Sequence, residues 1–108
     1  MHVLLDNGAP RGIASARRGH TVTESRSLGW DELKNSELLD AAESAGFKVF
    51  VTTDKNIRYP QNLSKRKIAI VVLGRGRWHL IQPMMSRIAA AVNAATPGTF
   101  VEISIPDR

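Results

Sequence analysis

Two aspartates, Asp6 and Asp54, have the placement in the chain that best suits chemistry. Each directly follows a run of residues typical of a strand: residues 3–5 precede the first aspartate and residues 47–53 precede the second. In an open parallel sheet, ligands bind in the crevice beyond the carboxyl ends of the strands. We therefore expect both carboxylates to lie at that edge of a sheet.

Three further candidates, Asn35, Ser36 and Glu37, begin the predicted helix that leads into the strand before Asp54. Asn and Ser are N-cap residue types, and an acid in the first turn favours the helix dipole. Clustered carboxylates can hold Mg²⁺ or Mn²⁺, which supply Lewis acidity for phosphodiester cleavage. The predicted metal ligands are Asp6, Asp54 and Glu37, and the predicted catalytic residues are these three with Asn35. Taken singly, each residue has an alternative as a turn former, a cap or a dipole partner.

The segment after Asp54 concentrates hydrogen-bonding side chains around one aromatic ring. Lys and Arg can bind phosphate, amides can read base edges, and a tyrosine ring can stack on a single-stranded base. The alternative is an ordered surface loop whose amides satisfy nearby backbone groups. The candidate nucleic-acid-binding residues are Lys55, Asn56, Arg58, Tyr59, Gln61 and Asn62.

Charge is divided unevenly along the chain. Residues 1–54 carry six Lys and Arg against eight Asp and Glu, whereas residues 55–108 carry nine against two. A basic half opposed to an acidic half suits a polyanion that is held by the first and acted on by the second. RNA is therefore one expected partner, and a merely solubilising surface is the alternative.

The elements that must position these residues alternate between strand and helix patterns. The run IAIVVL at residues 68–73 predicts a strand that is covered on both faces, as in a parallel sheet. The alternation predicts an α/β fold with a mostly parallel sheet between helices. The predicted strands are 3–5, 21–23, 47–53, 68–73 and an edge strand at 100–105. The predicted helices are 10–19, 35–46 and one whose apolar stripe spans 81–92, with Pro83 near its start or kinking it and Pro97-Gly98 closing it.

Length and composition limit the class of protein. The chain has 108 residues, which suits a single domain over residues 1–108. It has no cysteine, so disulfides and thiolate metal sites are excluded. No apolar stretch approaches the roughly 18 residues that a membrane span needs, and residues 1–6 are too short for a signal peptide. We expect a cytoplasmic protein.

A set of short segments stands in a recognisable order: residues 4–10, 19–22, 28–30, 33–39, 46–47, 51–56 and 61–63, together with Trp78. No single segment is specific, but the ordered set, which covers about residues 3–78, is fairly strong. It resembles the short PIN-like proteins of bacteria.

The resemblance implies a three-layer fold and a metal-dependent activity. Active PIN domains are Mg²⁺- or Mn²⁺-dependent ribonucleases, and many are toxins of toxin–antitoxin pairs. By position, Asp6 matches the acid after the first strand and Asp54 matches the acid of the Thr-x-Asp signature. Asn35 stands where PIN nucleases place a further acid. Glu37 lies two positions on, and positions i and i+2 do not share a helix face.

The substitution at Asn35 sets the expectations for metal and partners. With fewer anionic ligands, the ion is expected to be weakly held or absent in the free protein and recruited with RNA, and Mn²⁺ should serve better than Mg²⁺. An antitoxin protein is a further expected partner. A homo-oligomer through the 81–92 helix or the 100–105 edge is another.

Two other functions stay open at this point. A PIN-like fold that has lost its metal site would be a binding module for RNA or protein, and the amide at Asn35 favours this alternative. A purely structural protein–protein module is the third.

Overall fold

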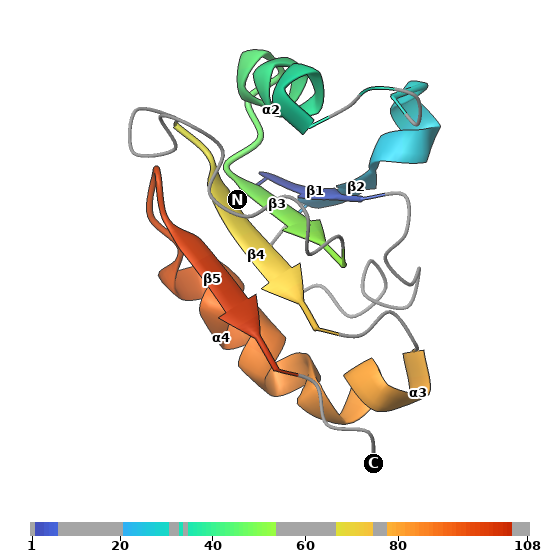
Figure 1. The fold of residues 1–108 in the computed structure, drawn as a ribbon, viewed down its shortest axis with the longest axis vertical. Coiled ribbons are helices and arrows are strands. Elements are labelled where there is room, and N and C mark those ends of the chain that lie inside the picture. Colours follow the sequence, from blue (N-terminus) through green and yellow to red (C-terminus); the bar gives the residue numbers. More distant parts are fainter. Residues whose placement is uncertain are drawn as a thin grey trace.

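The structure, a computed structural model, describes residues 2–6, 21–30, 33, 35–53, 67–74 and 78–104. Within these residues, five strands form one sheet, and every neighbouring pair is parallel. The strands are β1 (His2–Leu5), β2 (Thr21–Glu24), β3 (Val49–Thr52), β4 (Ala69–Leu73) and β5 (Phe100–Ile103). They lie in the order β2-β1-β3-β4-β5 (Figure 1). The parallel sheet that the sequence predicts is confirmed.

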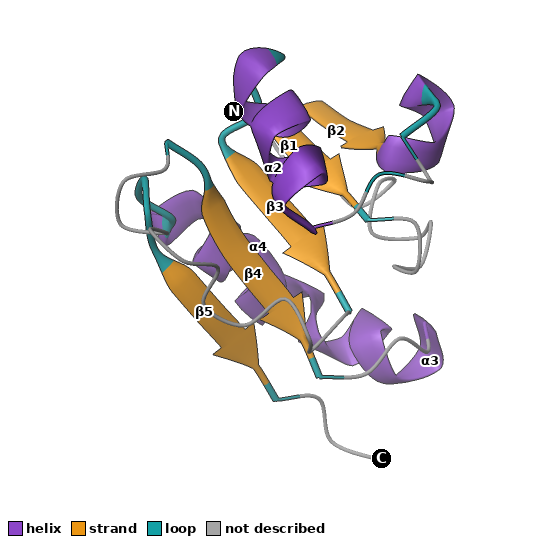
Figure 2. Ribbon diagram, turned by 45° about the horizontal axis from the view of Figure 1, so that its top comes forward, coloured by secondary structure: helices purple, strands orange, loops and turns teal. Residues whose placement is uncertain are grey.

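Helices cover both faces of the sheet, which gives the molecule three layers (Figure 2). Helix α2 (Asn35–Ser44) packs on one face. Helices α3 (Trp78–Ile81) and α4 (Met85–Ala94) pack on the other. The predicted α/β class, with a sheet flanked by helices, is therefore confirmed.

Alternation along the strands divides the core into two apolar layers, because successive side chains of a strand point to opposite faces. In β3, Val49 and Val51 face α4, whereas Phe50 faces α2. Every residue of β3 and β4 is buried. This is the burial expected for central strands of a parallel sheet, and it explains why residues 68–73 are apolar without interruption.

Helix α2 forms where the apolar stripe predicts it. Leu38, Leu39 and Ala42 are buried against the sheet. The helix ends at Ser44, and Gly46 follows in the turn with a φ of 91°, in the left-handed region that favours glycine. The Phe47 backbone N–H donates to the Ala42 carbonyl oxygen at 2.9 Å, which closes the helix end and turns the chain into β3.

The predicted helix 81–92 is divided in the structure. Helix α3 ends at Ile81, a 3₁₀ turn η4 (Gln82–Met84) contains Pro83, and α4 begins at Met85. Proline has no backbone N–H to donate, and its ring clashes with the carbonyl of the preceding turn. The break at Pro83 therefore follows from the residue itself.

Other boundaries differ from the predictions by a few residues. The strand predicted at 47–53 spans Val49–Thr52, and the edge strand predicted at 100–105 spans Phe100–Ile103. A 3₁₀ helix, η1 (Ser25–Leu28), follows β2 and was not predicted from the sequence. It ends at Gly29, with φ 75°. The predicted helix 10–19 lies outside the described residues.

Candidate functional site

Asp6 lies where the sequence places it, at the carboxyl end of β1. The register pairs Leu5 with Val51 of β3, and the Asp6 backbone N–H donates to the Val51 carbonyl oxygen at 2.9 Å. The Asp6 side chain is half-buried. By alternation it points to the α2 face of the sheet, as Leu4 does two residues earlier.

The hydroxyl of Thr52, the last residue of β3, holds the Asp6 carboxylate. Thr52 is fully buried, and its Oγ1 donates to Asp6 Oδ2 at 2.5 Å. That length is typical of an O–H donor bound to a charged carboxylate, and such bonds are about twice as strong as neutral ones. The bond fixes the direction of the Asp6 side chain at the edge of the sheet.

Ser25 reaches the same level of the sheet from the opposite side. The register ends with Leu5 paired with Glu24 of β2, and Ser25, the first residue of η1, follows Glu24 as Asp6 follows Leu5. Continued by one residue, this register would put Ser25 one strand spacing, about 4.8 Å, from Asp6. Its side chain is 1% exposed. The Ser25 carbonyl oxygen accepts from the Trp30 N–H at 3.1 Å. Its Oγ, in contrast, is buried and finds no hydrogen-bond partner in the described part of the chain.

The local structure after β2 explains how Ser25 becomes buried. The 3₁₀ turn η1 bends the chain toward the α2 face, where Trp30 and Leu33 pack against the apolar layer under α2. The Trp30 ring meets the Phe47 ring edge-on, with centroids 6.1 Å apart. We refer to Asp6, Thr52 and Ser25 as the Asp6 site.

Two predicted residues lie on α2. Asn35 is its first residue, and Glu37 is exposed in its first turn. The C-terminal end of α2 leads into the amino end of β3, and α2 has 10 residues, a length of about 15 Å. The first turn is therefore directed toward the carboxyl ends of the strands, as expected of a helix that precedes a parallel strand.

The predicted carboxylate cluster is only partly within the described residues. Asp54 lies outside them, as do the candidate nucleic-acid-binding residues Lys55, Asn56, Arg58, Tyr59, Gln61 and Asn62. Among the residues that the structure describes, no three His, Cys, Asp or Glu side chains gather closely enough to hold a metal ion. The metal set of Asp6, Asp54 and Glu37 therefore stays a prediction.

Most of the Lys and Arg residues in the basic half of the sequence also lie outside the described residues. Only four of the fifteen Lys and Arg residues lie in the described ranges, against six of the ten Asp and Glu residues. The described framework is thus acidic, and the positive charge of the chain resides in the remaining segments.

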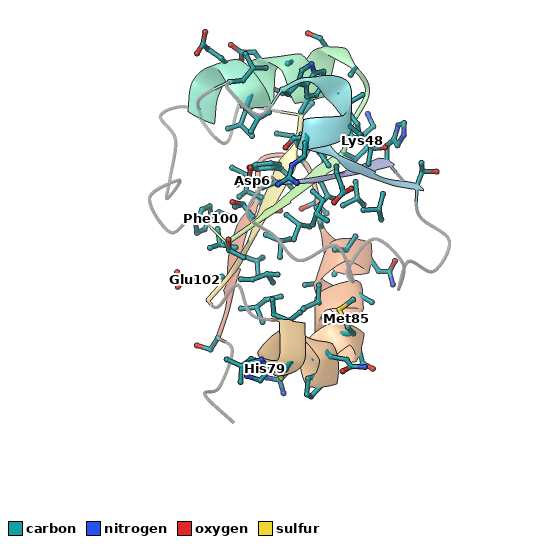
Figure 3. All side chains as sticks on the ribbon, turned by 90° about the vertical axis from the view of Figure 1, so that its right-hand side faces the viewer. Asp6, Lys48, His79, Met85, Phe100 and Glu102 are labelled. Carbon is teal, nitrogen blue, oxygen red and sulfur yellow. The ribbon has the colours of Figure 1, made fainter. Side chains whose placement is uncertain are left out.

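Two other polar residues are too far from Asp6 to join its site. Glu102 lies at the same level of the sheet, because Thr52 pairs with Val72 and Val72 with Glu102. It is nevertheless three strands from Asp6, about 14 Å at the usual spacing. His79, in α3, lies near the bottom of the view in Figure 3, well below Asp6.

An open hollow of about 440 Å³ lies at the C-terminal end of α2, away from the Asp6 site. Its lining residues are Asp40, Glu43, Ser44 and Lys67. The Lys67 backbone N–H donates to Glu43 Oε2 at 2.6 Å, which ties the start of β4 to α2. This hydrogen bond gives Glu43, which lines the hollow, a structural role.

Comparisons with models of known protein families, with curated proteins and with solved structures find no significant match to this chain. None of the described helices is both long enough and apolar enough to cross a membrane.

Sequence reasoning left out two members of the Asp6 site. Thr52 belongs to the Thr-x-Asp pattern, but only its aspartate received a role. Ser25 follows a β-branched run just as Asp6 follows an apolar one. The signal that could have found it was the same rule, that polar residues at the carboxyl ends of parallel strands converge.

Proposed function

We propose that the chain is a metal-dependent ribonuclease of PIN-like type, and that the Asp6 site is part of its active centre. The observation that supports this most directly is the bond from the buried Thr52 hydroxyl to the Asp6 carboxylate at the edge of a parallel sheet. Such an edge is the usual place for a ligand site in this fold class. A carboxylate held by a buried donor is also pre-oriented, as a catalytic group must be.

Asp54 is the second carboxylate of the proposed centre. It follows Thr52 by two positions, so covalent geometry limits the distance between their Cα atoms to about 7 Å. Thr52 is itself bonded to Asp6. The strand end that orients Asp6 therefore also carries Asp54, and this supports a pair of carboxylates acting together.

The chemistry of the donors fits a hard divalent cation. Carboxylate and hydroxyl oxygens suit Mg²⁺ and Mn²⁺, and Mg²⁺ needs only one or two carboxylates when water and substrate phosphate complete its shell. Asp6, Asp54 and Glu37 would hold the ion, with Asn35 in support. When bound, the ion supplies positive charge for the scissile phosphate and acidifies water for phosphodiester hydrolysis. The protein's own part is to fix the carboxylates and, through residues 55–62, to hold RNA.

The test is cleavage of single-stranded RNA with and without Mn²⁺. We expect cleavage that requires the ion and is lost in Asp6→Asn and in Asp54→Asn, since either change removes a ligand charge. Glu102→Gln is the matched control, because it also neutralises an acid at the same level of the sheet, about 14 Å away. Cleavage that persists without the ion, or that survives both Asp6→Asn and Asp54→Asn, would contradict the proposal.

A second function is favoured by the residue at the start of α2. An amide at Asn35 is a neutral, weaker ligand than the acid found there in PIN nucleases, and this supports a degenerate module that binds RNA or a protein such as an antitoxin. Calorimetry with Asn35→Asp separates the two functions. A nuclease should gain Mn²⁺ affinity from the added carboxylate. Unchanged Mn²⁺ affinity in Asn35→Asp, Asp6→Asn and Asp54→Asn would favour the binding module.

A further inference from the structure

Ser25 has a buried hydroxyl group that makes no hydrogen bond in the described part of the chain. The residue is 1% exposed, and Oγ has no hydrogen-bond partner in the described part of the protein. Leaving a hydroxyl buried and unbonded is unfavourable, so native proteins rarely do it without a water, an ion or a function at that atom. An orphan hydroxyl therefore marks a place where something else is expected to bind.

The position of this hydroxyl in the sheet indicates what that partner is. Ser25 and Thr52 follow corresponding register positions on the two strands that flank β1, so they stand on either side of Asp6. The Thr52 hydroxyl is already bonded to the carboxylate. By alternation from Glu24, the Ser25 side chain is directed to the same face of the sheet as Asp6. Its Oγ makes no hydrogen bond to the carboxylate, and rotation about one side-chain bond moves it between staggered positions.

We propose that Ser25 is a positioning residue of the Asp6 site, and that its Oγ binds the hydration shell of a divalent cation held by Asp6. A hydrated cation suits both groups, because Mg²⁺ keeps several of its waters when one or two carboxylates bind it. Those waters donate hydrogen bonds, and the oxygen lone pairs of a serine hydroxyl accept them. This inference rests on the proposed function, since it requires a cation at Asp6.

The orphan hydroxyl predicts opposite effects of Ser25→Ala on stability and on metal affinity. In the free protein, the change removes a buried polar atom that has no partner, so the melting temperature should stay the same or rise. In the metal complex, it removes an outer-shell partner, and such losses typically weaken metal affinity by about tenfold or more. If Ser25 had only a packing role, Ser25→Ala would not weaken Mn²⁺ binding while leaving the melting temperature unchanged or higher.

The experiment is titration of the full chain with Mn²⁺, by calorimetry and by water-proton relaxation. It is run with Mn²⁺ alone and with a 2′-O-methylated single-stranded oligonucleotide, because the ion is expected to bind best together with RNA. Ser27→Ala is the matched control. It lies in the same 3₁₀ turn, is exposed, and its hydroxyl donates to the Glu24 carbonyl oxygen at 2.7 Å. We expect Mn²⁺ affinity to fall about tenfold in Ser25→Ala and to stay unchanged in Ser27→Ala.

Asp6→Asn separates failure of this inference from failure of the proposed function. If Asp6→Asn weakens Mn²⁺ binding but Ser25→Ala does not, the role of Ser25 is wrong and the metal site stands. If wild type binds no Mn²⁺ under either condition, or if Asp6→Asn binds as well as wild type, both are wrong. A melting temperature that falls in Ser25→Ala without a change in Mn²⁺ affinity would assign the hydroxyl to a buried structural water instead.

Discussion

The bond between Thr52 and Asp6 gives the sharpest test of the site that does not depend on any ligand. Thr52→Val keeps the shape and the β-branch of the side chain and replaces the hydroxyl with a methyl group. A hydrogen bond to a charged group contributes about 1.5–3 kcal/mol. The added buried methyl returns about 0.8 kcal/mol.

Asp6 is only half-buried, so water can reach part of its carboxylate once the Thr52 hydroxyl is gone. This further reduces the stability lost in Thr52→Val. We therefore expect Thr52→Val to lower the free energy of unfolding by about 1–2 kcal/mol. For a domain of this size, the corresponding fall in melting temperature is about 4–8 °C. Urea unfolding followed by circular dichroism measures the first quantity, and calorimetry measures the second.

Two controls identify the bond as the cause. Thr53→Val makes the same chemical change one residue later, at a half-buried position, and should alter the stability by less than about 0.5 kcal/mol. A double-mutant cycle of Thr52→Val with Asp6→Asn should give a coupling energy of at least about 0.5 kcal/mol. Additive effects within about 0.3 kcal/mol would refute the reasoning, because two bonded groups cannot act independently.

Two further predictions concern the framework that carries the site. Leu39→Ala should lower the free energy of unfolding by about 2–5 kcal/mol in a urea titration, because it opens a cavity under α2. Leu28→Ala, at a side chain 41% exposed, should change it by less than about 0.5 kcal/mol, and equal losses would contradict the assigned core. Gly46→Ala should cost about 1–2 kcal/mol from backbone strain alone, since φ is 91° and the added Cβ meets no atom within 4 Å. Gly46→Asn should cost less, because asparagine tolerates the left-handed region, and a larger loss than in Gly46→Ala would disprove this explanation.

The class of fold and the order of the strands and helices could be predicted from the sequence alone. The apolar runs of β3 and β4 predict that these strands are buried, as they are in the structure. The apolar stripe of Leu38, Leu39 and Ala42 predicts α2. Both signals are local, because they depend on the period with which a strand or a helix exposes its side chains. Asp6 could be placed at a strand end for the same reason.

The residues around Asp6 could be identified only from the folded chain. Its hydroxyl partner Thr52 is 46 residues away in the chain, and strand register brings the two together. The register of β1 with β2 likewise brings Ser25 to the end of the strand next to Asp6, where an unpredicted 3₁₀ turn begins at Ser25. Strand pairing depends on contacts between distant segments, and no periodicity within one segment encodes it. The sequence therefore predicts that Asp6 lies at the carboxyl edge of the sheet. The fold brings Thr52 and Ser25 to the same edge, which makes it a candidate site.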